Sequence, residues 1–184
     1  MLIKWGREFN MSSLVDFQIR NLCRNIGLVE PFSSEMVNPA SIDVTLGGTI
    51  KVEGRSYGRP ADRARWIEHE IDLKDGYILP PGGFILAHTN EYVRIPNNLE
   101  SNFQLKSSRG REGINHLLAG YIDPGFQGQI TLELQNVNNR HNVVLKKGMR
   151  IGQLRFHTLS QIPLRSYAVT GRYYLDQGAV ASKG

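Results

Sequence analysis

One segment of alternating apolar and polar residues decides the fold of this chain: Gln129-Ile130-Thr131-Leu132-Glu133-Leu134-Gln135-Asn136. Successive side chains of a β-strand point to opposite faces, so the apolar and polar sets of this segment separate. The alternation predicts a strand with one face in a core. Glu133 stands in the middle of the polar face, where a solvent-exposed glutamate is the favoured interpretation from this segment alone.

Similar short runs recur on both sides of this segment, separated by clusters of Gly, Pro, Asn and Asp. Many short strands between turn signals are typical of an all-β barrel or sandwich. The predicted strands are Ile42–Leu46, Thr49–Val52, Glu70–Leu73, Phe84–His88, Tyr92–Ile95, Asn102–Leu105, Ile130–Asn136, Val143–Leu145 and Ile151–His157.

A short helix precedes the strands. Ser13 is its expected N-cap, with Asp16 three residues later, and Gly27 is a natural stop. Cys23 falls on the apolar stripe between them and is expected to be a small core residue. The chain is therefore expected to comprise an N-terminal extension (1–11), a β domain (12–165) and a C-terminal arm (166–184). The arm is either a frayed end or a flexible segment that orders on a ligand or a neighbouring subunit.

Composition excludes several classes of protein. The chain has 184 residues, 40% of them hydrophobic, which suits a single domain with one core. One cysteine allows neither an intramolecular disulfide framework nor a cysteine-based zinc cluster. The five histidines lack metal-ligand spacing, so no metal site is expected. No apolar run has the length of a membrane span and the start does not resemble a signal peptide, so a cytoplasmic protein without a membrane partner is expected.

The net charge of +5 leaves two interpretations open: an anionic partner, or a mildly basic surface without a role. The basic residues are scattered and form no run, which disfavours a nucleic-acid partner. The segment Lys106-Ser107-Ser108-Arg109-Gly110-Arg111-Glu112-Gly113 has the hydroxyls, cations and glycines that can cradle phosphate oxygens. On composition alone, a solvated polar turn is favoured for it.

Seven segments in this order and spacing resemble the dCTP deaminase branch of the trimeric dUTPase-like superfamily. Each is a weak signal alone, but their shared order along most of the chain is specific, and it changes the favoured interpretation of Glu133 to a catalytic one. The segments are Asn38–Gly47, Leu79–Ala87, Lys106–Gly113, Ile122–Gly128, Thr131–Asn136, Lys147–Gln153 and Gln177–Ser182.

The resemblance implies a fold, an assembly and a mechanism. The implied fold is a mainly β, distorted barrel or jelly roll of the β-clip type, assembled as a homotrimer with sites between subunits. Glu133 matches the glutamate that activates water to attack C4 of cytosine without zinc. Ser107 and Arg111 match residues that position the water and the proton network.

The resemblance also implies how the nucleotide is held. Mg²⁺ would be carried by the substrate triphosphate. Lys106 and Ser108 match phosphate-loop positions, Asp123 matches the aspartate that contacts the 3′-hydroxyl, and Tyr167 and Arg172 look like residues that close over the triphosphate. The further nucleotide-binding positions implied are Ala119, Thr131, Asp176 and Gln177.

Two departures from the family pattern stand out. Asp176 occupies the position of a usual glutamine, with Gln177 next, and a carboxylate facing a phosphate is unfavourable. Leu118 stands where the family usually has threonine. Leu118 either alters which cytosine derivative is accepted or is a plain core residue, and both interpretations stay open.

The leading functional hypothesis is hydrolytic deamination of dCTP, or of a 5-substituted dCTP, to the corresponding dUTP and ammonia. One alternative is a bifunctional dCTP deaminase and dUTP diphosphatase that yields dUMP. The other is a non-catalytic nucleotide-binding relative. A pure dUTPase is disfavoured because its glycine-rich C-terminal motif is absent from the sequence.

Overall fold

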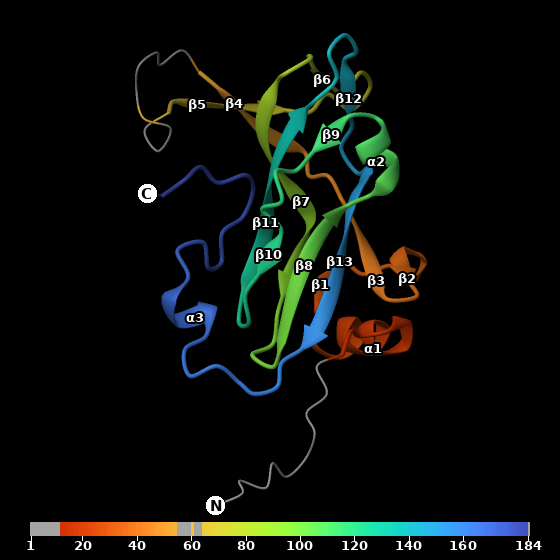
Figure 1. Cartoon of the computed structure of the whole chain (residues 1–184), viewed down its shortest axis with the longest axis vertical. Coiled ribbons are helices and arrows are strands. Elements are labelled where there is room, and N and C mark those ends of the chain that lie inside the picture. The colour runs from red at the N-terminus through yellow and green to blue at the C-terminus, as the bar shows by residue number, and fades with distance from the viewer. Residues whose placement is uncertain (1–11, 55–59, 61–63, 184) are drawn as a thin grey trace, which may run out of the picture.

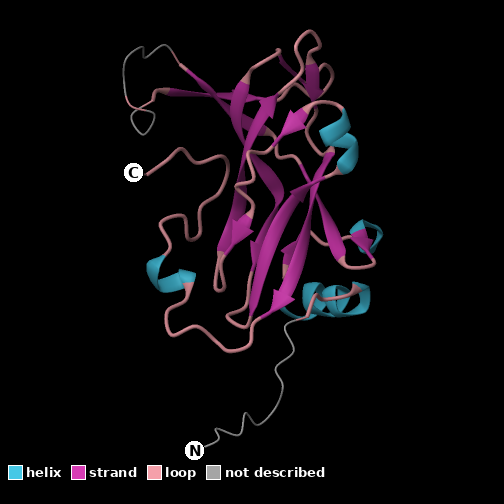
Figure 2. Ribbon diagram, in the orientation of Figure 1, coloured by secondary structure: helices cyan, strands magenta, loops and turns pink. Residues whose placement is uncertain are grey.

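Two antiparallel sheets form the body of the protein in a computed structural model that describes residues 12–54, 60 and 64–183 (Figures 1 and 2). The first sheet has the order β5 (Trp66–Glu70), β4 (Thr49–Glu53), β7 (Phe84–Arg94), β11 (Gln127–Asn136) and β9 (Ile114–Asn115), and β1 (Val29–Glu30) also pairs with β7. The second has the order β10 (Tyr121–Ile122), β8 (Leu99–Leu105), β13 (Arg150–Thr158), β3 (Ser41–Thr45) and β2 (Val37–Asn38). A separate pair joins β12 (Val143–Leu145) to β6 (Tyr77–Leu79).

The two sheets share one hydrophobic core. Along β11, buried and half-buried residues alternate without a break, as the sequence pattern predicts. Its buried Leu134 belongs to the same cluster as Ile85 of β7 and as Val44 and Phe156 of the second sheet. The prediction of a mainly β protein is therefore confirmed, and the polar face of β11 remains free to line a site.

The N-terminal helix is confirmed, but its predicted cap is wrong. Helix α1 spans Asp16–Ile26 with Val15 at the N-cap, whose amide nitrogen donates to Gln18 Oε1 at 3.1 Å. Ser13 instead bridges to His157 of β13, and Leu14 donates to the Phe156 carbonyl. This pairing keeps the chain extended beyond Ser13. Gly27 ends the helix with a φ of 64°, and Cys23 is buried as expected.

Two predicted strand boundaries are also wrong. The strand predicted over 70–73 lies earlier, because β5 pairs along its whole length with β4 and Asp72 enters a turn. The two strands predicted over 84–95 are the single strand β7. Its polar middle is retained in the sheet because the buried Glu91 carboxylate accepts hydrogen bonds from the Thr45 amide and hydroxyl, at 2.8 and 2.6 Å.

The remaining helical elements are short and lie on opposite sides of the body: η1 (Ser34–Met36) and α2 (Ser107–Arg111) on one side, α3 (Tyr167–Thr170) on the other (Figure 1). After α3 the chain runs along β11. The predicted extension of residues 1–11 lies outside the described residues, and the boundary between 165 and 166 stays a prediction. No helix in the described part of the chain combines the length and apolar character needed to cross a membrane.

Candidate active site

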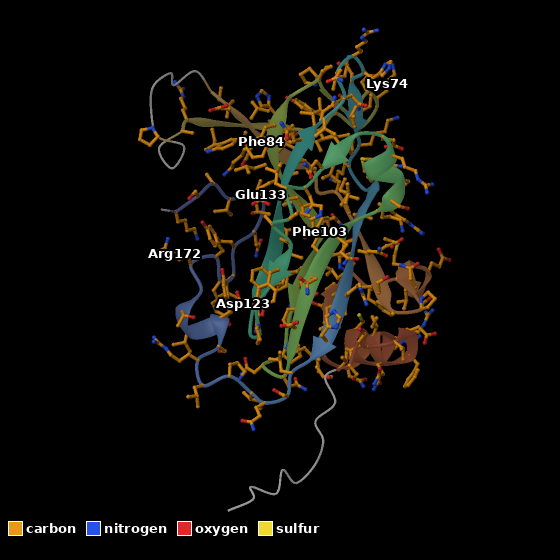
Figure 3. All side chains as sticks on the ribbon, in the orientation of Figure 1. Lys74, Phe84, Phe103, Asp123, Glu133 and Arg172 are labelled. Atoms are coloured by element: carbon orange, nitrogen blue, oxygen red, sulfur yellow. The ribbon has the colours of Figure 1, made fainter. Side chains whose placement is uncertain are left out.

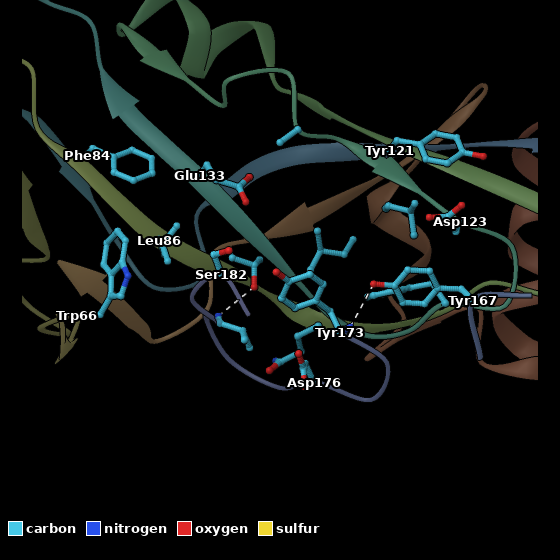
Figure 4. A pocket seen from close by; sticks show the side chains of 17 residues that line it. Trp66, Phe84, Leu86, Tyr121, Asp123, Glu133, Tyr167, Tyr173, Asp176 and Ser182 are labelled. Atoms are coloured by element: carbon cyan, nitrogen blue, oxygen red, sulfur yellow. Dashed lines mark hydrogen bonds between the residues drawn. The ribbon is translucent and has the colours of Figure 1, made fainter. Parts of the chain in front are cut away.

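A cavity of about 550 Å³ opens between β11, the segment that precedes it, and the C-terminal arm (Figures 3 and 4). Trp66, Phe84 and Leu86 form an apolar wall beside Glu133. Six residues assigned to the site from sequence line this one cavity: Ala119, Asp123, Thr131, Glu133, Tyr167 and Asp176.

Glu133 is half-buried on the cavity face of β11, where its strand partner is Leu86. Burial raises the pKa of its carboxyl group above the ordinary value of 4.5. A β-bulge between Gln129 and Thr131 interrupts the register two residues before it. Bulges of this kind re-aim side chains next to active sites. A half-buried carboxylate with a raised pKa is suited to accept a proton from water near neutral pH.

Asp123 supplies a second carboxylate, at the turn before β11. Residues Asp123-Pro124-Gly125 form a turn: the Phe126 amide donates to the Asp123 carbonyl at 3.1 Å, and Gly125 has a φ of 84°. Burial first, and then the charge of Glu100, raises the pKa of Asp123. Tyr121 donates its hydroxyl to Glu100 at 3.0 Å, and burial together with Glu100 raises the pKa of this phenol to about 12. Asp123 thus presents a hydrogen-bond acceptor at the same cavity as Glu133.

The C-terminal arm is hydrogen-bonded to β11 on the side of the cavity. Backbone contacts join Leu175 to Gln127 at 2.8 Å and Gln129 to the Asp176 carbonyl at 3.0 Å. Val180 donates its amide to Thr131 Oγ1 at 3.1 Å. The close approach needs Gly128, where a Cβ atom would lie 2.8 Å from the Asp176 carbonyl oxygen. The arm is therefore attached to the strand that carries Glu133.

Tyr167 and Arg172 lie where the arm passes the cavity. The Tyr167 ring packs against Phe126 with centroids 5.6 Å apart, and burial is the main cause of its raised phenol pKa. Its hydroxyl accepts the Tyr173 amide at 3.3 Å. Arg172 lines an adjoining cavity that shares Asp123, Tyr167 and Tyr173 with the first. Gln177 is exposed and lines neither of these two cavities.

The other predicted residues lie in helix α2 and at its N-cap, Lys106, and this helix is separate from the cavity. Ser107, Ser108 and Arg111 are exposed and do not line it in the described chain. Lys106 points inward: its ammonium donates to both oxygens of the buried Asp43 carboxylate, at 2.8 and 2.7 Å. Within one chain, the structure does not bring these four residues to Glu133.

Leu118 is 89% exposed, so its interpretation as a core residue is wrong for this chain. Leu117 and Leu118 both have positive φ, 55° and 60°, a conformation that costs free energy for residues other than glycine. They directly precede Ala119 at the cavity.

Sequence reasoning missed the aromatic wall and Tyr173. Trp66 of β5 and Phe84 of β7 belong to the two strands that flank β4 in the sheet, and their ring centroids lie 6.0 Å apart, which no local motif indicates. Tyr173 had an available signal, since it directly follows Arg172. Among the residues that the structure describes, no group of three or more His, Cys, Asp or Glu side chains is placed to hold a metal ion. The zinc-free mechanism stays a prediction.

Comparison with known proteins identifies the family. Residues 13–159 match the model of the dCTP deaminase-like family. The chain is 40% identical over 158 residues to a dUMP-forming dCTP deaminase of Dictyoglomus thermophilum, covering 81% of each chain. It is 41% identical over 157 residues to the enzyme of the same description from Bifidobacterium adolescentis, again covering 81% of each.

A solved structure agrees with the fold. The crystal structure of 2′-deoxycytidine 5′-triphosphate deaminase from Agrobacterium tumefaciens superposes with a TM-score of 0.63 at 25% identity. The match covers 81% of this chain and 49% of that one, so this chain spans about half the length of the solved protein. Family model, relatives and fold agree, and this chain belongs to the dCTP deaminase family.

Proposed function

We propose that this protein deaminates dCTP and carries the product on to dUMP, so that dCTP and two waters yield dUMP, ammonia and pyrophosphate. The observation that carries this choice is the 40% identity to dUMP-forming deaminases over most of the chain. These relatives support the bifunctional alternative better than the leading expectation from sequence, in which dUTP is released.

The deamination step is assigned to Glu133. Its carboxylate accepts a proton from water as the water oxygen attacks C4 of the cytosine ring, and passes this proton to N3 of the ring. Glu133 then takes the remaining proton from the new C4 hydroxyl and gives it to the amino group, the C4–N4 bond breaks, and ammonia leaves behind a C4 carbonyl and a protonated N3. The half-buried position of Glu133 and its raised pKa support this role.

The nucleotide is assigned to the cavity and its mouth. Asp123 accepts a hydrogen bond from the 3′-hydroxyl, and Ala119 and Thr131 border the base. Tyr167 and Arg172 cover the triphosphate, which brings its own Mg²⁺. Gln177, which follows Asp176 in the arm, is assigned to the same phosphates, although it lines neither cavity of its own chain.

The protein is further proposed to act as a homotrimer. Ser107, Ser108 and Arg111 lie outside the cavity of their own chain, although their match to the family implies contact with the nucleotide. If α2 of a neighbouring copy reaches this cavity, its residues can contact the nucleotide although they lie outside the cavity of their own chain. Lys106, held by Asp43, supports the start of that helix.

The test is a product analysis. Purified protein is incubated with dCTP and Mg²⁺, and ammonia, pyrophosphate and nucleotides are measured together. The proposal expects equal amounts of ammonia, pyrophosphate and dUMP. Accumulation of dUTP would restore the simple deaminase, and binding of dCTP without turnover would favour a non-catalytic relative. Activity that disappears with the zinc chelator phenanthroline would contradict the zinc-free mechanism.

A further inference from the structure

The charge of the cavity is unfavourable for a triphosphate. Its lining includes the carboxylates of Asp123, Glu133 and Asp176, and no Lys or Arg side chain among the described residues that line it. Glu133 and Asp123 have roles at the base and the sugar. Asp176 has no such role, and an unpaired carboxylate beside phosphate oxygens repels them strongly where water is partly excluded.

Asp176 is also unable to move away easily. Its carbonyl accepts the Gln129 amide at 3.0 Å, and the Leu175 amide donates to Gln127 at 2.8 Å. These two bonds attach it to β11 on both sides of its Cα atom. Figure 4 shows Asp176 close to Tyr173 at the cavity.

Lys183 neutralises this carboxylate. Its ammonium nitrogen lies 2.6 Å from Asp176 Oδ2 and 2.8 Å from the Arg172 carbonyl oxygen. It also stands over the Tyr173 ring, 5.0 Å from the centroid. Three different contacts thus orient one cation whose side chain is 41% exposed, and a cation with several contacts holds its geometry better than one with a single partner.

We propose that Lys183 is a specificity-determining residue for the triphosphate: it cancels the charge of Asp176, so that phosphates beyond the first are accepted at the mouth of the cavity. The inference rests on the proposed function and adds a binding residue to it. The competing explanation is mechanical, in which the pair only closes the arm between residues 176 and 183.

A set of four variants separates these explanations. The affinities for dCTP and dCMP are measured by calorimetry in full-length protein that carries Glu133→Gln, so that no turnover interferes. Lys183→Met leaves Asp176 unpaired, while Asp176→Asn and the double variant remove the negative charge. Lys74→Met is the matched control, because Lys74 is exposed and lies away from Asp123 and Glu133 (Figure 3).

Lys183→Met is expected to weaken dCTP binding about tenfold, the effect of losing one charged hydrogen bond, and to leave dCMP binding unchanged. The double variant is expected to recover most of the dCTP affinity, because the repulsion is gone. A double variant as weak as Lys183→Met would establish the mechanical role and overturn the proposal. Equal affinities for Lys183→Met and Lys74→Met would overturn it as well.

Failure of the proposed function is measured separately. If wild-type protein releases no ammonia from dCTP, the assignment as a deaminase fails, whatever the affinities are. If ammonia is released but the four variants bind dCTP equally, only the role of Lys183 fails.

Discussion

The Val180 amide donates to Thr131 Oγ1 at 3.1 Å, two residues before Glu133 on the same strand. Val180 and Glu133 line the same cavity. Attachment of the arm and exclusion of water around the proposed general base therefore depend on one strand, and changes at Thr131 should affect both.

Glu133→Gln is expected to lower kcat by about 10³-fold, because the amide cannot accept the proton of the attacking water. Affinity for dCTP should stay close to that of the wild type, since glutamine has the same size. Ammonia release and calorimetry measure the two effects. Glu70→Gln, at an exposed position of β5, is the matched control. Wild-type turnover in Glu133→Gln protein would contradict the assignment.

The acid limb of the pH profile follows from the same residue. Only the deprotonated carboxylate can act as the base, and burial raises the pKa of Glu133 above 4.5. As the pH falls through this raised pKa, kcat/KM should fall, so the midpoint of the limb is expected above 4.5. Tryptophan fluorescence recorded at each pH distinguishes a loss of activity through unfolding from a loss through protonation of Glu133. A midpoint at or below 4.5, with the protein still folded, would mean that another group controls the rate.

Thr131→Val removes the acceptor of the Val180 amide at nearly constant volume. A lost hydrogen bond of this kind costs about 1 kcal/mol, so KM for dCTP is expected to rise about fivefold. Hydrogen exchange of residues 172–183 should become faster, which a local effect on the base alone would not produce. Thr170→Val is the control, since the Thr170 hydroxyl donates to the Ser166 carbonyl within the arm and not to β11 among the described residues. Unchanged hydrogen exchange of residues 172–183 in Thr131→Val protein would show that the Thr131 hydroxyl does not hold the arm on β11.

The sequence predicts β11 well because its alternation reflects one buried face, and Val143–Leu145 because polar residues bound it on both sides. It does not predict β5, whose polar residues are held in the sheet by pairing with β4. The break predicted within β7 has the same cause, since Glu91 is satisfied by Thr45, far away in the chain. Local sequence patterns indicate which residues are buried. The strand structure of β5 and of the middle of β7 depends instead on residues that are distant in the chain.

The candidate site likewise contains residues that the sequence motifs predict and contacts that they do not. Motif order predicts Glu133, Asp123 and Tyr167 at one cavity. It gives no indication that Lys183 pairs with Asp176. Motif positions also do not reveal that Lys106 is bonded inward to Asp43.

Lys106→Met tests this inward contact. The Asp43 side chain is fully buried, and Lys106 supplies two of its hydrogen bonds, beside Asn38 and Arg150. Removal of the ammonium should lower the free energy of unfolding by about 2 kcal/mol, measured by urea denaturation against Lys74→Met. If Lys106→Met protein binds dCTP more weakly but has an unchanged free energy of unfolding, the structural role of Lys106 is contradicted. Its role as a phosphate-binding residue is then favoured.

Complementation tests whether α2 acts on a neighbouring chain. Glu133→Gln and Arg111→Ala proteins are each expected to be inactive, since each lacks one half of every site. If Arg111 serves the cavity of an adjacent subunit, mixed trimers contain sites with Glu133 from one variant and Arg111 from the other. For random assembly of equal amounts in a cyclic trimer, about a quarter of the sites are complete, which sets the expected recovery of activity.

The subunits are unfolded together and refolded, and size-exclusion chromatography checks the assembly. A mixture of two Glu133→Gln preparations is the control and should stay inactive. Recovery depends on separate chains for the two residues, because a site built from one chain alone is defective in both variants. An inactive mixture that has assembled as a trimer would therefore place Arg111 and Glu133 of the same chain in one site.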